Sequence, residues 1–286
     1  MLASRHHAVL PHPSFVMYQS IAIANSGPFT AVPLRGFEHD LEGMLAAIRS
    51  DTSLVIVCNP NNPTGAYIDP AVLRVFLEQV PADVVVALDE AYGEFVTSPA
   101  REETATWVED FPNLVVLRTF SKIYGLAGLR IGYAIADPEV IGALDKVRQP
   151  FNVDSLAQVA AVESLKHPER MAERRATIAE ERVRLTALLG VLGIKCYSGE
   201  ANFLLVDVTG LGMPGPEVGQ ALLAKGILTR SGYAMGCPGW IRVTIGKAEE
   251  GDVFVAALKE LRDGKAHTDA QVADTAVDAA SLSPES

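Results

Sequence analysis

Leu54-Val-Ile-Val-Cys58-Asn-Pro-Asn-Asn-Pro-Thr-Gly65 is the stretch of this 286-residue sequence that decides the fold. Its first five residues are apolar and mostly β-branched, without the polar alternation of a half-exposed strand, which is typical of a strand covered on both faces. Its last seven residues are rich in Pro and Asn, which form turns. The stretch therefore predicts an interior strand of a parallel sheet that ends in a rigid loop.

Further apolar runs of strand length follow at Val84–Leu88, Leu114–Leu117 and Ile131–Ala136, and the helical pattern Val72–Val80 precedes the first of them. Alternation of buried strands with helices predicts an α/β fold, with a mostly parallel sheet in a three-layer αβα large domain. The sequence leaves open whether the last of these strands is an antiparallel edge strand.

The second half of the chain mixes helices with short strands, which predicts a smaller α+β domain. The predicted helices are Ser155–Leu165, Glu169–Leu192, Glu217–Lys225 and Asp252–Leu261, and the predicted strands are Phe203–Val208, Ile227–Arg230 and Trp240–Ile245. We expect a large domain at 1–167 and a small domain at 168–264. Residues 265–286 have almost no large apolar side chains, so we expect a disordered tail there.

The composition excludes several function classes. With 24 Lys+Arg against 35 Asp+Glu, the formal charge is −11, which argues against nucleic acid as a partner. No apolar run is long enough to span a membrane, and Met1–His12 lacks the apolar core of a signal peptide, so we expect a cytoplasmic protein. Cys58, Cys196 and Cys237 fit neither a disulfide framework nor a zinc site, and no metal is predicted.

Four polar clusters stand at the ends of predicted strands or inside one. They are Asn59–Gly65, Asp89–Tyr92, Thr119–Lys122 with the following Gly125–Arg130, and Trp240–Gly246. Alone, each has a plain interpretation as a turn, a helix cap, a surface lysine or a structural ion pair. Together they place an acid, an amide, a phenol, an amine, hydroxyls and arginines where open α/β sheets bind ligands.

Four motifs, in this order along the chain, resemble those of the class I/II aminotransferases: Cys58–Gly65, Asp89-Glu-Ala-Tyr92, Thr119-Phe-Ser-Lys122 and Arg242-Val-Thr-Ile-Gly246. These are fold-type-I enzymes that use pyridoxal 5′-phosphate (PLP). Within that group, the sequences of these motifs most resemble those of the histidinol-phosphate aminotransferases. The resemblance extends from about Pro13 to Leu261.

The resemblance implies catalytic roles for several residues. Lys122 would bond covalently to the PLP aldehyde and later move protons as acid and base. Asp89 would bind the pyridine nitrogen, which makes the ring an electron sink. Asn62 and Tyr92 would hydrogen-bond the phenolic oxygen of the cofactor.

The resemblance also implies the remaining contacts. Ser121 and Arg130, assisted by Thr119, would hold the cofactor phosphate, and Phe15 would stack on the ring, although a plain core phenylalanine fits the sequence nearly as well. In the substrate site, Arg242 would bind the carboxylate of glutamate or 2-oxoglutarate, with Asn202 beside it. Two interpretations of Arg230 remain open: it contacts the substrate phosphate, or it is a surface arginine at the end of a strand.

The implied activity is a transaminase of histidine biosynthesis that works as a homodimer. It would exchange an amino group between a small-molecule donor and an oxo-acid acceptor, namely glutamate/2-oxoglutarate and histidinol phosphate/imidazole-acetol phosphate. Three alternatives remain open: an aromatic amino-acid aminotransferase, a truncated PLP-binding homologue with impaired catalysis, and, less favoured, a β-eliminating lyase.

The N-terminus departs from the family pattern. Family members usually carry a further N-terminal segment, with the first strand and helix of the large domain and a loop for the cofactor phosphate, and Met1–Pro11 is too short to supply it. We therefore expect either a misplaced start or fragment, or a shortened protein with an uncovered sheet edge.

Overall fold

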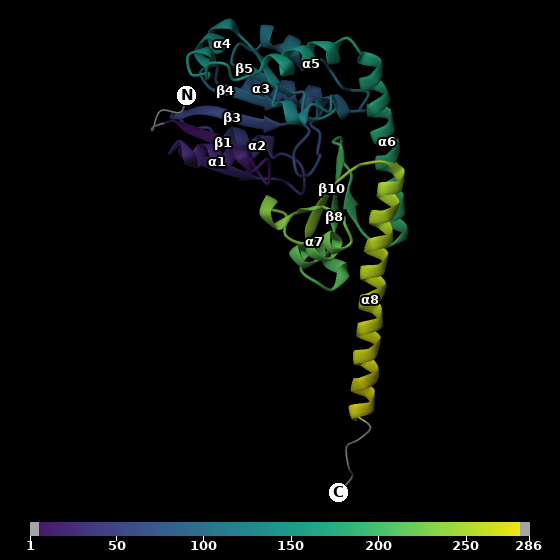
Figure 1. Ribbon diagram of the computed structural model, residues 1–286. Helices are drawn as coiled ribbons and strands as arrows, with labels where there is room; N and C mark the ends of the chain where they lie inside the picture. Colours follow the sequence, from purple (N-terminus) through teal and green to yellow (C-terminus); the bar gives the residue numbers. More distant parts are fainter. Residues whose placement is uncertain (1–5, 281–286) are drawn as a thin grey trace.

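The computed structural model describes residues 6–280, with side chains described for residues 6–264. It has two lobes, each built on one sheet (Figure 1). The large lobe holds six strands in the order β2-β1-β3-β4-β5-β6. Their bounds are β1 (His7–His12), β2 (Phe29–Pro33), β3 (Thr52–Cys58), β4 (Val85–Asp89), β5 (Leu114–Thr119) and β6 (Gly132–Ala136).

The large sheet is parallel except at one edge. Strands β1 to β5 pair in parallel, and β6 pairs antiparallel with β5. The predicted α/β fold with a mostly parallel sheet is confirmed, and the strand whose direction the sequence left open is antiparallel.

Helices cover both faces of this sheet. Along β3, Val55 and Val57 belong to the core formed with α2 (Leu41–Ala46) and α3 (Pro70–Gln79). The alternate residues Leu54 and Ile56 pack on the opposite face, in the cluster that includes Ala22 of α1 (Met17–Ala24). Because successive side chains of a strand point to opposite faces, the continuous apolar run is explained by cover on both sides.

Strand β1 lies in the interior of the sheet, between β2 and β3, although the pattern of apolar runs predicts no strand there. Its residues Ala8, Val9 and Leu10 are at most 1% exposed. The polar His7 is accommodated because its ring nitrogens lie 2.8 Å from both Thr52 Oγ1 and Thr30 Oγ1. Pro11 lies beyond the part of β1 that pairs with β3, so its missing N–H interrupts no bond to that strand.

The small lobe is an antiparallel sheet in the order β7-β8-β10-β9. Its elements are β7 (Cys196–Tyr197), β8 (Phe203–Asp207), α7 (Gly215–Ala224), β9 (Arg230–Ser231) and β10 (Trp240–Thr244). The strand predicted at Ile227–Arg230 is wrong: only Arg230 and Ser231 pair with β10, and Leu228 is 84% exposed. An apolar run does not form a strand where no neighbouring strand is available to hydrogen-bond with it.

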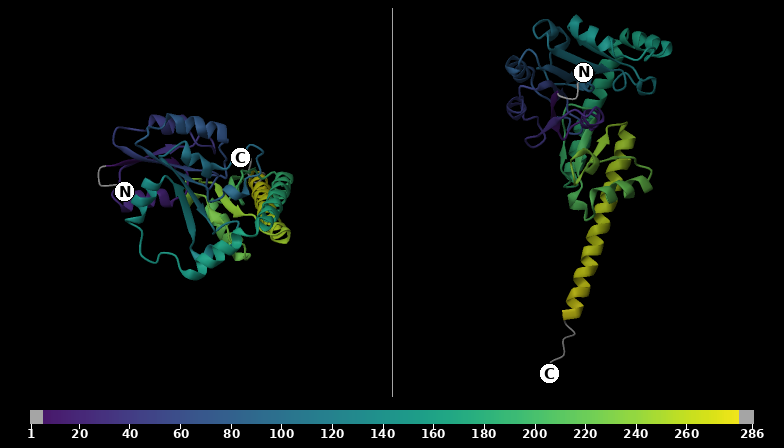
Figure 2. Two further views of the ribbon diagram at one scale, coloured as in Figure 1. Left: turned by 90° about the horizontal axis from the view of Figure 1, so that it is seen from above. Right: turned by 90° about the vertical axis from the view of Figure 1, so that its left-hand side faces the viewer.

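The remaining helices connect and flank the lobes. They are α4 (Pro138–Asp145), α5 (Ser155–Leu165) and α6 (Pro168–Val191), with short 3₁₀ helices η1 (Gly93–Phe95), η2 (Thr104–Glu109), η3 (Ala127–Leu129), η4 (Thr209–Leu211) and η5 (Tyr233–Met235). Helix α6 runs beside both lobes (Figure 2) and contacts η1 of the large lobe and α8 (Ala248–Ala280) of the small one. The exact domain limits, 1–167 and 168–264, stay a prediction.

Helix α8 (Ala248–Ala280) packs Phe254, Ala257 and Leu258 into the small-lobe core and then extends away from the body (Figure 1). Here the structure differs from the expected disordered tail, because the backbone is helical as far as Ala280. This segment is rich in alanine, the residue with the highest helix propensity. The end of the predicted tail, 281–286, lies outside the described residues. Nowhere in residues 6–280 is there a helix long and apolar enough to cross a membrane.

Candidate active site

Three loops meet at the carboxyl ends of the neighbouring strands β3, β4 and β5. Because parallel strands all end at the same edge of the sheet, the predicted clusters converge there on a cavity of about 300 Å³. All the residues predicted to contact the cofactor line this cavity: Phe15, Asn62, Asp89, Tyr92, Thr119, Ser121, Lys122 and Arg130. The structure brings them together, and their individual roles stay predictions.

Lys122 is the amine of this cavity. It follows β5, and its Nζ lies 5.1 Å from the centre of the Tyr92 ring. Burial lowers the pKa of Lys122, the charge of Arg242 lowers it further, and Asp89 opposes the change. A lysine with a lowered pKa has a larger fraction of neutral amine, which is the nucleophilic form.

Asp89 ends β4 with its carboxylate held by two donors. The backbone N–H of Ala91 donates to Oδ1 at 3.0 Å, and the Tyr18 hydroxyl donates to Oδ2 at 2.6 Å. Each carboxylate oxygen has two lone pairs, so both keep acceptor capacity for a group in the cavity.

Asn62 and Tyr92 connect the cavity to the small lobe. Arg242 of β10 donates from Nη1 to Asn62 Oδ1, and its guanidinium lies 4.9 Å from the centre of the Phe203 ring. Burial raises the pKa of Tyr92 to about 12, although Arg242 opposes the rise. The phenol therefore keeps its proton at neutral pH and can donate a hydrogen bond.

The hydroxyl and guanidinium groups expected to hold a phosphate lie around the start of the Lys122 loop. Thr119 Oγ1 accepts from the Ser121 backbone N–H at 3.0 Å, which shapes the turn. Arg130 has a left-handed backbone (φ 51°), and its Nη1 donates to the Ala127 carbonyl at 2.7 Å. Phe15 is 39% exposed, with an edge-on contact to Tyr18, so the structure places it at the cavity wall rather than in the core.

The predicted substrate residues lie on the small sheet. Arg230 of β9 stands directly opposite Arg242 of β10. Arg242 is partly buried, and its Nε has no hydrogen-bond partner among residues 6–264. Burial lowers the pKa of Arg242, with Arg230 adding to the effect. Asn202 is fixed through its backbone, since its carbonyl accepts from Ile245 at 2.9 Å. None of these three lines the cavity that contains Lys122.

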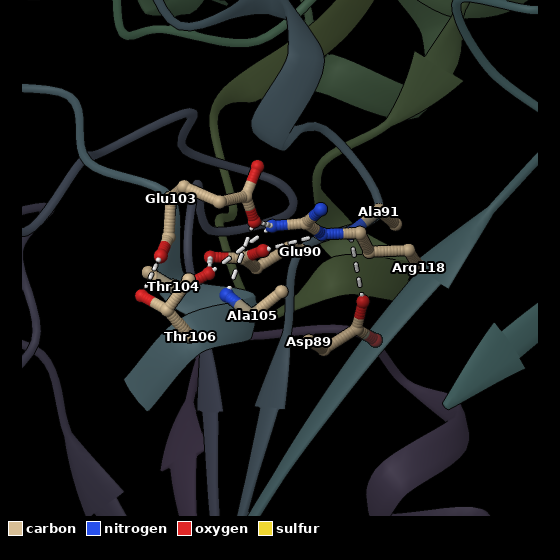
Figure 3. Close-up of polar contacts among 8 residues, drawn as sticks. All are labelled: Asp89, Glu90, Ala91, Glu103, Thr104, Ala105, Thr106 and Arg118. Carbon is tan, nitrogen blue, oxygen red and sulfur yellow. Dashed lines mark hydrogen bonds and ion pairs between the residues drawn. The ribbon is translucent and has the colours of Figure 1, made fainter. Parts of the chain in front are cut away.

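An ion-paired cluster flanks Asp89 (Figure 3). Arg118 Nε donates to Glu90 Oε2 at 2.9 Å, and the other Glu90 oxygen accepts from Thr104 at 2.6 Å. Arg118 also reaches Glu103. Glu90 follows Asp89 on the chain and Arg118 precedes Thr119, so this cluster ties the end of β4 to the end of β5.

Five further residues, which the sequence motifs did not single out as site residues, line the cavity: Tyr18, Cys58, Ala91, Leu117 and Arg118. Cys58, Ala91 and Arg118 adjoin or belong to the motifs, so their position along the chain was a usable signal. Tyr18 had no such signal, because its partner Asp89 is 71 residues away.

Comparison with known proteins decides the family. The sequence profile of the aminotransferase class I and II family matches residues 1–258. The chain belongs to this family. The resemblance inferred from the motifs is thereby confirmed.

Two aminotransferase relatives are each 44% identical to the chain. One is a histidinol-phosphate aminotransferase from Brevibacillus brevis, aligned over 92% of this chain and 71% of the relative. The other is a histidinol-phosphate aminotransferase from Moorella thermoacetica, aligned over 88% of this chain and 65% of the relative. The chain thus spans about two thirds of the length of these relatives.

A solved aminotransferase supports the fold at the level of structure. The histidinol-phosphate aminotransferase from Sinorhizobium meliloti, crystallised with PLP, superposes with a TM-score of 0.83 at 28% identity, over 92% of this chain and 72% of that one. The donor set here fits such a group: an amine, a carboxylate with spare acceptor capacity, hydroxyls with a guanidinium, and an aromatic wall line one cavity.

Proposed function

We propose that this protein is a PLP-dependent transaminase that exchanges an amino group between glutamate/2-oxoglutarate and histidinol phosphate/imidazole-acetol phosphate. One observation carries the proposal: Asp89 and Tyr92, at the end of β4, line a single cavity with Lys122, which follows β5. The 44% identity to histidinol-phosphate aminotransferases supports the choice of substrate.

PLP, when bound, supplies an aldehyde for the substrate amine and a ring that withdraws electrons from the carbon bearing that amine. Asp89 would hold the ring nitrogen with its spare acceptor capacity. The neutral amine of Lys122, favoured by its lowered pKa, would take the proton from the substrate carbon that bears the amine. It would return that proton two atoms along, across the nitrogen, at the carbon of the former aldehyde. Thr119, Ser121 and Arg130 would bind the cofactor phosphate.

The substrates on both sides of the exchange are anions. Arg242 and Arg230 lie opposite one another on adjacent strands, and two guanidinium groups together match the charge of a phosphate monoester or a dicarboxylate. The unpartnered Nε of Arg242 is a donor that such an anion would satisfy.

The experiment is a half-reaction followed by visible absorbance. Protein loaded with PLP is mixed with histidinol phosphate or, separately, with phenylalanine. The proposal predicts a fast spectral change with histidinol phosphate, its reversal by 2-oxoglutarate, and no change for Lys122→Ala. A faster change with phenylalanine would favour the aromatic amino-acid alternative, and a chain without cofactor absorbance would overturn the proposal.

A homodimer in the cytoplasm belongs to the same proposal. Helix α5 has apolar residues on all sides, yet Leu156 is 76% and Val159 69% exposed, and the preceding Phe151 is fully exposed. A helix that is apolar all round is normally buried. We propose that a second copy of the chain covers these exposed residues.

The free cysteines bear on the compartment. Cys58, Cys196 and Cys237 form no disulfide, which agrees with a reducing compartment such as the cytoplasm.

A further inference from the structure

Tyr18 reaches Asp89 from a distant part of the fold. It lies on α1, which packs on the large sheet, and its hydroxyl donates to Asp89 Oδ2 at 2.6 Å. The Ala91 N–H already holds the other oxygen of this carboxylate at 3.0 Å. The two donors come from different segments and together fix the plane of the carboxyl group.

The environment of Tyr18 fixes the direction of this hydrogen bond. Tyr18 and Asp89 both line the cavity that contains Lys122. Burial raises the pKa of Tyr18 well above its usual value, and the negative charge of Asp89 adds to the rise. The phenol therefore stays protonated, and Asp89 receives its single hydrogen.

Other contacts besides this bond hold both segments in place. The turn after β4 is already closed by the Ala91 N–H on Asp89. Helix α1 is held on the sheet by apolar contacts, with Ala22 in one cluster with Ala8 and Leu10. The Tyr18 ring keeps its edge-on contact with Phe15, with centroids 5.5 Å apart, whether or not it carries a hydroxyl.

We propose that Tyr18 is a positioning residue for the cofactor: its hydroxyl aims the Asp89 carboxylate at the ring nitrogen of PLP. This inference rests on the proposed function. Its consequence is that Tyr18 controls PLP affinity and the absorbance of bound PLP only through Asp89, without a bond of its own to the reacting atoms.

The test uses the full chain and measures PLP binding rather than turnover. PLP is titrated into Tyr18→Phe, and the dissociation constant and the pH dependence of the bound absorbance are recorded. We expect the dissociation constant for PLP to rise about tenfold, which is roughly 1.4 kcal/mol, because the Asp89 carboxylate keeps only one of its two fixed donors. Tyr197→Phe, which removes the hydroxyl of a tyrosine outside the cavity, should leave both readouts unchanged.

A double-mutant cycle separates positioning from a general loss of structure. In an Asp89→Asn background, Tyr18→Phe should have no further effect on either readout, because its route to PLP is gone. An equal loss in both backgrounds, or a dissociation constant for Tyr18→Phe within twofold of the parent, would overturn the inference while leaving the proposed function intact. Failure of the parent chain to bind PLP would instead overturn the proposed function.

A second variant covers the case that Tyr18→Phe does not fold. Fluorotyrosine at position 18 keeps the ring and the hydroxyl but makes the phenol a stronger donor. A shift in the pH dependence of the bound absorbance supports the inference, and an unchanged profile contradicts it.

Discussion

Arg242 and Arg230 stand opposite one another on β10 and β9, so two cationic side chains share one face of the small sheet. Like charges directly opposite on neighbouring strands are destabilising. Such a pair is typical of a site at which an anion completes the charge balance.

Arg230→Gln should therefore separate binding from stability. We expect the KM for histidinol phosphate to rise about tenfold, a loss of roughly 1.4 kcal/mol in phosphate binding, while the free energy of unfolding stays level or increases by a few tenths of a kcal/mol. Steady-state kinetics and urea unfolding measure the two. Lys247→Gln, the same charge change outside the pair, is the control, and an equal rise of KM in both variants would refute a specific role.

Glu94 should make stability depend on pH. Burial raises its pKa to about 7, and one of its carboxylate oxygens is buried with no hydrogen-bond partner in the part of the chain whose side chains are described. Arg118 and Arg101 oppose this rise and Glu90 adds to it. Because the folded state holds this proton more tightly than the unfolded state, the stability from Glu94 is complete at acid pH and is lost as the pH rises through about 7.

Glu94→Gln should thus be more stable than the parent at pH 8, by on the order of 2 kcal/mol, and nearly equal to it at pH 4. Urea unfolding across this range measures the difference. A constant difference at all pH values would show that Glu94 does not titrate in this way.

Removing one partner of the Glu90–Arg118 ion pair should lower the free energy of unfolding. Their side chains are only 9% and 14% exposed, so Arg118→Met leaves Glu90 as a buried charge. We expect a loss of about 3 kcal/mol in the unfolding free energy of the apoprotein. The double variant Glu90→Gln/Arg118→Met should lose less than Arg118→Met alone; additive losses would argue against a coupled pair.

Association should depend on α5. The double variant Leu156→Asp/Val159→Asp should shift the chain from dimer to monomer in sedimentation experiments, because it charges the exposed apolar residues. Val183→Asp, at a site on α6 that is 70% exposed, should remain a dimer. A parent chain that sediments as a monomer would remove the homodimer from the proposal.

The sheet could be predicted where its strands are covered on both faces. The runs that became β3, β4 and β5 are continuously apolar, and the polar residues after them had to meet at one edge because the strands are parallel. Strand β1 could not be predicted because it begins with the polar His7. This side chain can be buried because it hydrogen-bonds Thr30 and Thr52, which are 23 and 45 residues away. No local pattern carries that information.

At the surface the sequence pattern gave the opposite error: it predicts a longer strand than the structure has. Ile227 to Arg230 has the composition of a strand, but it follows Gly226 (φ 79°) and leaves Leu228 exposed. Pairing, and not propensity, decides such a segment. The site shows the same limit, since the Tyr18–Asp89 bond joins segments whose nearness only the fold creates.

Lys122 must bond covalently to PLP for the proposed transamination to proceed. The full chain is incubated with PLP, reduced with borohydride, digested and analysed by mass spectrometry. We expect a pyridoxyl phosphate adduct on the peptide that contains Lys122, and its loss in Lys122→Ala. An adduct confined to other lysines, or none on a folded chain, would contradict it.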